Sequence, residues 1–392
     1  MRILQLLTMA LPWIVTPGTA NPFLEGKEVF LLAGTWGMVL WTAFKRPLLP
    51  GLGLQNPWLG WVALYLVGMG LWHFQWQYLW RTPTQTQMVY NVYTWLPTVS
   101  VIGILLLIRT LACAYLRTAF QVTQLTQWLC ASAALVACYA ILQTWGIDQW
   151  FHMQLGATNT WQGTSAGFGN PSYCAIYLAS LSPLCLLFKA KRYLFYLGLI
   201  WCGLAATGIR YAWVLSAIGI GSYLVSRWWM SWHGWCRLLL WLGLGVASVG
   251  VGWLVWRWTP GDERWLIWPL AWERLQSSPL HKVPGWTGYG LGSFELLMRG
   301  TPYGWAHNEW LQALVELGVI GTSLCVAAVG WTTRHAWRHA TTSLMDAGWF
   351  GVWMVLLAAS IFHFPFHLAP LIWVGVCAWA VLERTQGEDA YA

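Results

Sequence analysis

Long apolar stretches recur from one end of the chain to the other, separated by short polar segments, as in residues 128–142 and 238–256. A helix of about 20 apolar residues is long enough to cross a bilayer. The pattern predicts an all-α polytopic membrane protein with about twelve spanning helices, because helices satisfy their own backbone hydrogen bonds in lipid. No stretch is polar enough for a separate soluble domain, so residues 1–392 are expected to form a single transmembrane domain.

The distribution of Lys and Arg predicts how these helices are oriented. Cytoplasmic loops of membrane proteins are enriched in Lys and Arg, and this bias fixes the topology. With Arg2 inside, every predicted inner loop carries Lys or Arg, and both termini are cytoplasmic. The predicted spans are residues 1–15, 29–44, 58–79, 89–108, 128–145, 173–188, a tight pair over 193–225, 238–255, 308–331, 349–361 and 369–382.

The N-terminal residues allow a second interpretation. Arg2, an apolar run and the small residues at 18–20 are also features of a secretory signal peptide. A short first helix interrupted by Pro12 is preferred, because it makes the charges of all loops downstream consistent with one topology.

Composition excludes several other classes of protein. Only 9% of the residues are charged, against about 25% in soluble domains. The inner loops explain the net charge of +8, and no basic cluster suits nucleic acid, so no nucleic-acid partner is expected. The cysteines lie nearly all in apolar runs, with no CxxC pair and no mixed Cys/His cluster, so neither a disulfide framework nor a zinc site is expected.

Residues 257–306 form a large predicted outer loop between the ninth and tenth helices, which is periplasmic if the family resemblance given below holds. Residues 260–262 predict a turn and a helix N-cap, and a short helix is expected over 263–275 with a kink at Pro269. This helix is apolar on several sides, so it is expected to lie in the membrane interface. Arg264 at its start would then either point inward at a headgroup or be an exposed Arg that binds lipid phosphate, and the segment alone favours neither.

Arg210 is the only charged residue between Arg192 and Arg227, and it lies midway between them. Two short helices from the cytoplasmic side would meet there, which puts Arg210 at the outer tip of a helical hairpin. An Arg that only fixes topology belongs on the cytoplasmic side. We therefore favour a guanidinium that binds an anion over one that snorkels to the interface.

His307 lies at the start of the tenth predicted helix, followed by Asn308 and Glu309. The positive end of the helix dipole favours a neutral imidazole, and a neutral His within reach of a hydroxyl can act as a general base; a polar helix cap is the alternative. Glu309 and Glu316 share a helix face, with Glu316 roughly 10 Å deeper. A carboxylate at that depth needs a cationic partner, and we expect Arg210.

Alternating glycines at 288, 290 and 292 precede this helix. Glycines of this kind let a backbone approach a ligand closely. Residues 284–294 do not match a nucleotide-binding phosphate loop, because no strand precedes them and no Gly-Lys-Ser follows.

Two other features of the predicted outer side concern possible ligands. His363 and His367 flank a Phe-Pro-Phe turn, and we interpret them as interface residues rather than as ligands or bases. The predicted outer loops contain no Asp-x-Asp pair for Mg²⁺ or Mn²⁺, so a bound diphosphate would be neutralised by arginines. No metal and no cofactor is expected.

Several segments resemble the superfamily of O-antigen ligases and O-antigen polymerases, which transfer lipid-linked oligosaccharides and include protein O-oligosaccharyltransferases. These segments are residues 168–171, Arg264 followed by 284–294, the most specific stretch 307–321, and the turn at Phe364-Pro365. Arg210 matches the family's intramembrane Arg by position. The surrounding sequence departs from the family, because it is Gly208-Ile209-Arg210-Tyr211 where Ser-Arg-Gly is usual.

The resemblance implies a GT-C-like fold and metal-independent, inverting glycosyl transfer on the periplasmic face of a bacterial inner membrane. The donor would be a glycan on undecaprenyl diphosphate. Arg210 and Arg264 would bind the diphosphate and stabilise its leaving charge, and His307 would accept the proton of the acceptor hydroxyl. The supporting residues would be Asn308, Glu309, Glu316, Gly290 and Gly292.

The acceptor remains open. Lipid A-core, a protein such as a pilin and a growing glycan all fit the superfamily, and the short segment after the last predicted helix favours the lipid A-core ligase. A transporter of an anionic lipid or solute is the alternative from another class. It would use Arg210 and Glu316 but would not need His307, and it should contain internal repeats, which are not evident here.

Overall fold

The protein is described by a computed structural model. The described residues are 2–14, 25–45, 62, 64–66, 100–101, 103–108, 110–147, 164–228, 264–277, 284–294, 298, 301 and 306–383. Every regular element within these ranges is a helix. The predicted span 238–255 and the predicted turn 260–262 lie outside the described residues, and the predicted spans 58–79 and 89–108 are described only in part.

Three of the described helices are long and apolar enough to cross a membrane, namely α5 (Ala119–Thr144), α14 (Glu309–Ala340) and α15 (Leu344–Phe362). Shorter apolar helices cover parts of other predicted spans, among them α1 (Arg2–Ala10), α7 (Pro171–Leu181) and α16 (Ala369–Glu383). The fold is therefore that of a helical membrane protein, while the number of spans remains a prediction.

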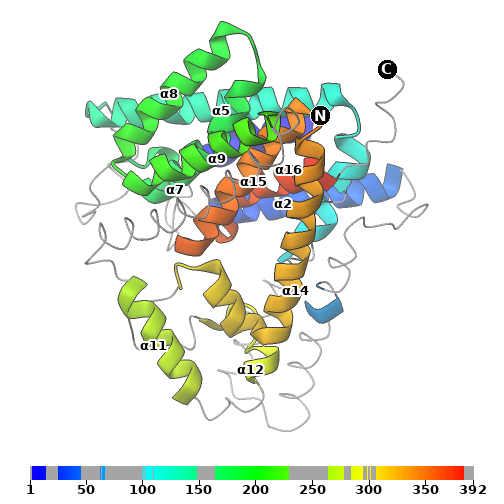
Figure 1. The fold of residues 1–392 in the computed structure, drawn as a ribbon, viewed down its shortest axis with the longest axis vertical. Helices are drawn as coiled ribbons and strands as arrows, with labels where there is room; N and C mark the ends of the chain where they lie inside the picture. Colours follow the sequence, from blue (N-terminus) through cyan, green and yellow to red (C-terminus); the bar gives the residue numbers. More distant parts are fainter. Residues whose placement is uncertain are drawn as a thin grey trace.

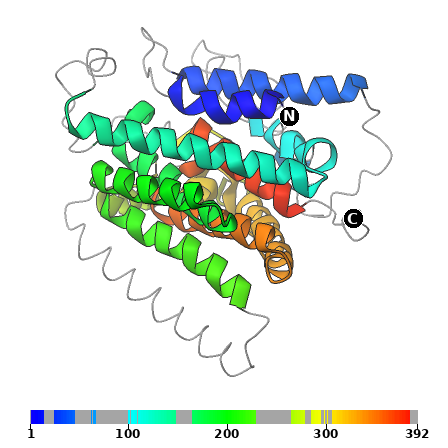
Figure 2. The ribbon, with the colours of Figure 1, turned by 90° about the horizontal axis from the view of Figure 1, so that it is seen from above.

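The helices form a bundle from which α14 extends. In Figure 1, α5, α7, α8 (Lys191–Thr207), α9 (Arg210–Trp228), α15 and α16 lie together. Helix α14 runs from this bundle to the short helix α12 (Pro284–Thr287), near α11 (Arg264–Ser277). Figure 2 shows α1 and α2 (Glu25–Lys45) along one side of the bundle.

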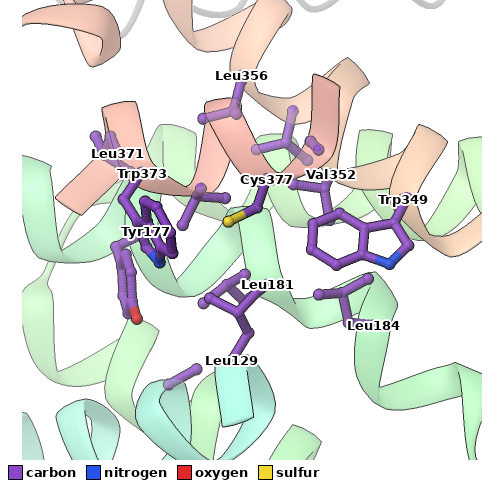
Figure 3. Packing of buried hydrophobic residues seen from close by; sticks show 14 of the residues in the cluster. Leu129, Tyr177, Leu181, Leu184, Trp349, Val352, Leu356, Leu371, Trp373 and Cys377 are labelled. Atoms are coloured by element: carbon purple, nitrogen blue, oxygen red, sulfur yellow. The ribbon is translucent and has the colours of Figure 1, made fainter. Parts of the chain in front are cut away.

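The bundle core combines large aromatic side chains with satisfied polar groups. Figure 3 shows Trp349 beside Val352 and Leu184, and Trp373 beside Tyr177 and Leu371, in one cluster of buried hydrophobic residues. The indole of Trp349 donates to Thr126 Oγ1 at 3.1 Å, and that of Trp373 donates to Thr8 Oγ1 at 3.1 Å. Because buried N–H groups are costly when unpaired, these bonds fix how α15 and α16 dock on α5 and α1.

Glycines let two helix pairs approach closely. A Cβ at Gly219 on α9 would overlap Val355 of α15, and a Cβ at Gly351 on α15 would overlap the carbonyl oxygen of Gly219. A Cβ at Gly203 on α8 would likewise overlap Ala137 of α5. Small residues at such crossings are the usual basis of helix packing in membranes.

The N-terminal part of α2 differs from the prediction. The predicted spans 1–15 and 29–44 leave Glu25, Lys27 and Glu28 in the outer loop between them, but α2 begins at Glu25 and includes all three. The Lys27 side chain is buried, donates to the carbonyl oxygen of Gly167, and lies 5.8 Å from the centroid of the Phe168 ring. Lys27 therefore fixes the segment that leads into α7.

The hairpin of α8 and α9 agrees with the prediction. Helix α8 ends at Thr207, Gly208 adopts φ 70° as its C-cap, and α9 begins at Arg210. This left-handed position is one that Gly occupies without strain. Arg210 is exposed at the tip of the hairpin.

Candidate functional site

His307 lies in a tight turn that begins α14. Asn308 is the N-cap, and its side-chain oxygen accepts from the amides of Trp310 and Leu311 at 2.9 Å each. His307 itself has φ 50°, a left-handed conformation that costs a residue other than Gly about 1–2 kcal/mol. Such strain persists only where the surroundings determine the conformation, and it is frequent at functional sites.

The residue before His307 is fixed by two side chains. Trp268 on α11 donates from its indole to the carbonyl oxygen of Ala306 at 2.8 Å. The amide of Ala306 donates to the side-chain oxygen of Gln312 at 3.5 Å. Helix α11 contains Pro269, as predicted, and its buried Ile267 packs in one apolar cluster with Ala306. Together with the Asn308 cap, these contacts hold His307 from both sides.

The ring of His307 faces the turn between α15 and α16. Its centroid lies 5.6 Å from that of His363 and 4.9 Å from that of Phe364. His363 caps the C-terminus of α15, is 4% exposed, and also meets the ring of Tyr173 at 5.5 Å. One aromatic cluster thus lies at the N-terminal end of α7, formed by Tyr173, His307, His363 and Phe364.

Arg264, the first residue of α11, lies beside the same cluster. Its guanidinium is 5.9 Å from the centroid of the Tyr211 ring, a distance typical of a cation–π contact. The Tyr211 ring is in turn 6.3 Å from that of His363. Two residues singled out from separate parts of the sequence, Arg264 and His307, therefore flank His363.

The charge environment of His363 keeps its imidazole neutral. Burial, the Arg264 guanidinium and the His307 ring all hold the pKa of His363 well below its usual range. A neutral imidazole carries one N–H donor and one acceptor nitrogen. The Nδ1 atom of His363 is enclosed and has no hydrogen-bond partner among the described residues.

Glu309 joins the start of α14 to the turn at residues 365–367. Its carboxylate accepts from the amide of Phe366 at 2.8 Å and lies 3.1 Å from Nδ1 of His367. Burial alone would lower the pKa of His367, but the carboxylates of Glu309, Glu316 and Glu28 raise it to about 9. His367 is therefore charged at neutral pH and holds its turn against α14.

The partner predicted for Glu316 is wrong. Among the described residues, Glu316 accepts from the side-chain amide of Gln312 at 3.2 Å and from the backbone amide of Phe294 at 3.3 Å. The positive charge near it is that of His367, whereas Arg210 is exposed at the tip of another hairpin. Sequence spacing gives the depth of Glu316 along its own helix, but not which other helix faces it.

The segment with the alternating glycines, residues 288–292 (the glycine segment), lies against α14. Gly318 has φ 66° and interrupts α14, and Gly288 has φ 76°. A Cβ on either glycine would overlap the backbone of the other segment. The amides of Tyr289 and Gly290 donate to the carbonyl oxygens of Val315 at 3.1 Å and Glu316 at 2.8 Å. The kink in α14 thus frees carbonyls that the glycine segment binds.

Gly290 and Gly292 belong to this docked segment. Both have positive φ, 97° and 77°, and the amide of Gly292 faces the carboxylate of Glu316. The Tyr65 hydroxyl reinforces the joint by donating to the carbonyl oxygens of Thr287 at 2.9 Å and Leu317 at 2.6 Å. The sequence predicted that these glycines approach a ligand; among the described residues, the backbone that they approach is that of α14.

Several residues of the cluster were not expected to take part. His363 and His367 were interpreted as interface residues, and Tyr173, Tyr211 and Gln312 were not considered. A histidine directly after an apolar helix and between aromatic residues is a signal that could have identified His363. No comparable signal marks Tyr211, because its role depends on how α9 and α11 meet.

A comparison of the chain with models of known protein families gives no match, and neither does a comparison with curated proteins.

Proposed function

We propose that the protein is an inverting glycosyltransferase that moves a glycan from undecaprenyl diphosphate to an acceptor hydroxyl on the periplasmic face of a bacterial inner membrane. The observation that carries this proposal is the cluster in which Arg264 and His307 flank His363. An anion-binding group and a proton acceptor are the two functions that such a transfer requires of the protein.

The chemistry divides between these two side chains. The acceptor oxygen attacks the anomeric carbon as His307 takes its proton, so the new C–O bond forms opposite the leaving group. The bond from the anomeric carbon to the phosphate oxygen breaks, and its electron pair leaves with the diphosphate. The Arg264 guanidinium binds the developing charge through paired N–H donors.

The remaining candidate residues support this arrangement in different ways. Asn308 caps α14 and thereby fixes the turn of His307. Glu309 ties α14 to the turn after α15, and Glu316 ties it to Gly290 and Gly292. Arg210 is proposed to contact the diphosphate or the lipid headgroups, since it is exposed beside Tyr211.

We propose lipid A-core as the acceptor, which makes the protein an O-antigen ligase. A pilin-type protein acceptor and a growing O-antigen are the alternatives. The sequence resemblance supports the superfamily as a whole, so the acceptor has to be found by experiment.

The test is transfer in vitro with purified protein, undecaprenyl-diphosphate glycan and each candidate acceptor, in the presence of EDTA. We expect wild-type transfer to persist in EDTA, because arginines take the role of a divalent cation. His307→Ala and Arg264→Ala should each lower kcat/KM by at least about a hundredfold. Arg338→Ala, which removes an exposed Arg near the other end of α14, is the matched control and should transfer normally.

The same experiment separates the transferase from a carrier. A transporter of an anionic lipid would bind the donor through Arg264 but would have no step in which a proton is removed. Full transfer by His307→Ala would contradict the assigned base. Donor binding without transfer to any of the acceptors would favour the carrier.

A further inference from the structure

His363 is a buried polar group of this cluster that the proposed reaction does not use. It is 4% exposed, it caps α15, and its Nδ1 is enclosed without a hydrogen-bond partner among the described residues. Buried polar side-chain atoms in folded proteins are almost always hydrogen-bonded, and exceptions often mark a functional site or an absent ligand. The position of His363 therefore requires an explanation.

The groups that face His363 come from four different elements. Tyr173 approaches from α7, Tyr211 from α9, Arg264 from α11 and His307 from the turn before α14. Among the described residues, the charged or titratable groups that lower the pKa of His363 are Arg264 and His307, and neither is a carboxylate. The surroundings of His363 are therefore suited to an anion.

The nearby carboxylates are engaged elsewhere. Glu309 is bound by the Phe366 amide and His367, and Glu316 by Gln312 and the Phe294 amide. Both carboxylates are therefore engaged by other donors. Among the described residues, an anion beside His363 would meet donors rather than these two carboxylates.

We propose that Nδ1 of His363 donates a hydrogen bond to an oxygen of the diphosphate group that Arg264 binds. This inference rests on the proposed function, and it adds a second ligand-contacting histidine with a role distinct from that of His307. His307 is part-exposed and can meet an incoming hydroxyl, whereas His363 is enclosed behind it. Because Nδ1 is enclosed, side chains around it must move before the ligand can reach it. The part-exposed Arg264 side chain is one that can move in this way.

Binding should then be linked to protonation. A bound diphosphate offsets the charge of Arg264, one of the causes that depress the pKa of His363, so this pKa rises in the complex. A group with a higher pKa in the bound state takes up a proton on binding. Relative to a variant without the imidazole, the affinity for the diphosphate is therefore expected to increase as the pH falls.

The experiment measures binding, separately from transfer. Purified protein in detergent is titrated with farnesyl diphosphate between about pH 5.5 and about pH 8, a range that spans the ordinary pKa of His at about 6.5. Tryptophan fluorescence reports binding. His363→Phe keeps an aromatic ring but has no nitrogen, so we expect it to bind about tenfold more weakly at the acid end. His363→Asn keeps a donor near the Nδ1 position and should restore much of the affinity without the pH dependence.

The chain offers a matched control in His335. This histidine lies in the opposite half of α14, and its Nε2 is also enclosed without a partner among the described residues. His335→Phe should leave both the affinity and its pH dependence unchanged. Thermal unfolding of each variant identifies any loss that comes from misfolding, and His363→Asn remains informative if His363→Phe is unstable.

The outcomes separate the two proposals. Unchanged affinity and unchanged pH dependence in His363→Phe would overturn the role of His363, while wild-type transfer would leave the proposed function intact. If the wild type neither binds the diphosphate nor transfers a glycan, the proposed function fails together with this inference.

Discussion

At the scale of single residues, the turn that carries His307 combines a strained backbone with fixed neighbours. Its φ of 50° is unfavourable for any residue with a Cβ, yet Trp268 holds Ala306 and the Asn308 cap holds the other side. The surrounding contacts therefore maintain the strained conformation. This arrangement keeps the imidazole against His363 and Phe364.

The strain at His307 can be measured with two substitutions. His307→Ala keeps the Cβ and its steric cost, whereas His307→Gly removes both. We expect His307→Gly to be more stable than His307→Ala by about 1 kcal/mol, although Gly normally destabilises a folded chain. Thermal unfolding in detergent provides the comparison, and a less stable Gly variant would show that the turn is not strained.

The contact of Glu309 with His367 makes stability depend on pH. The pKa of His367 is raised to about 9, so its contribution is fully present below the ordinary value of about 6.5 and is lost as the pH rises through 9. We expect the melting temperature of the wild type to fall between about pH 7 and about pH 10, the interval around the raised pKa of His367. Glu309→Gln should weaken this dependence, and an equal slope in both proteins would exclude the contact as its cause.

At the scale of elements, the joint between the glycine segment and α14 determines where His307 lies. The kink at Gly318 frees carbonyl oxygens that the amides of Tyr289 and Gly290 bind, while Tyr65 bridges Thr287 and Leu317. Such close backbone contacts require that neither segment carries a side chain where the two cross. The joint therefore depends on two glycines from distant parts of the sequence.

Substitution of either glycine should break this joint. Gly318→Ala and Gly288→Ala each add a Cβ at a left-handed position and against another backbone, so we expect each to cost about 2 kcal/mol or more. Glycan transfer should fall with stability, because the segment before His307 moves. Gly330→Ala is the matched control on α14: its Cβ would meet open space, and helix propensity predicts a gain of up to about 1 kcal/mol.

Sequence reasoning identified features of the site that depend on local order. The start of a helix at residues 307–309, the short helix that contains Pro269 and the hairpin tip at Arg210 follow from the residues immediately around them, and each is present. The contact of Glu316 with the glycine segment could not be derived in this way. It depends on a break at Gly318 and on helix packing, neither of which appears in the periodicity of one helix.

At the scale of the whole molecule, the length of α14 separates the cluster around His363 from a group of exposed arginines. The cluster around His363 lies at the N-terminal end of α14, and Arg334 and Arg338 lie near its C-terminal end. The Lys and Arg distribution predicts that the first end faces the periplasm and the second faces the cytoplasm. The described helices support a membrane protein, while this orientation awaits a direct test.

Cysteine labelling in intact cells provides that test. Trp286, on α12, is 64% exposed, and Leu344, at the start of α15, is 55% exposed; each can be replaced by Cys at an end of the molecule. We expect a membrane-impermeant maleimide that has crossed the outer membrane to label Trp286→Cys in intact cells. Leu344→Cys should react only after the inner membrane is permeabilised, and the unsubstituted protein gives the background from native cysteines. The reverse pattern would put the cluster of His307 and His363 in the cytoplasm, where a transfer to periplasmic acceptors could not take place.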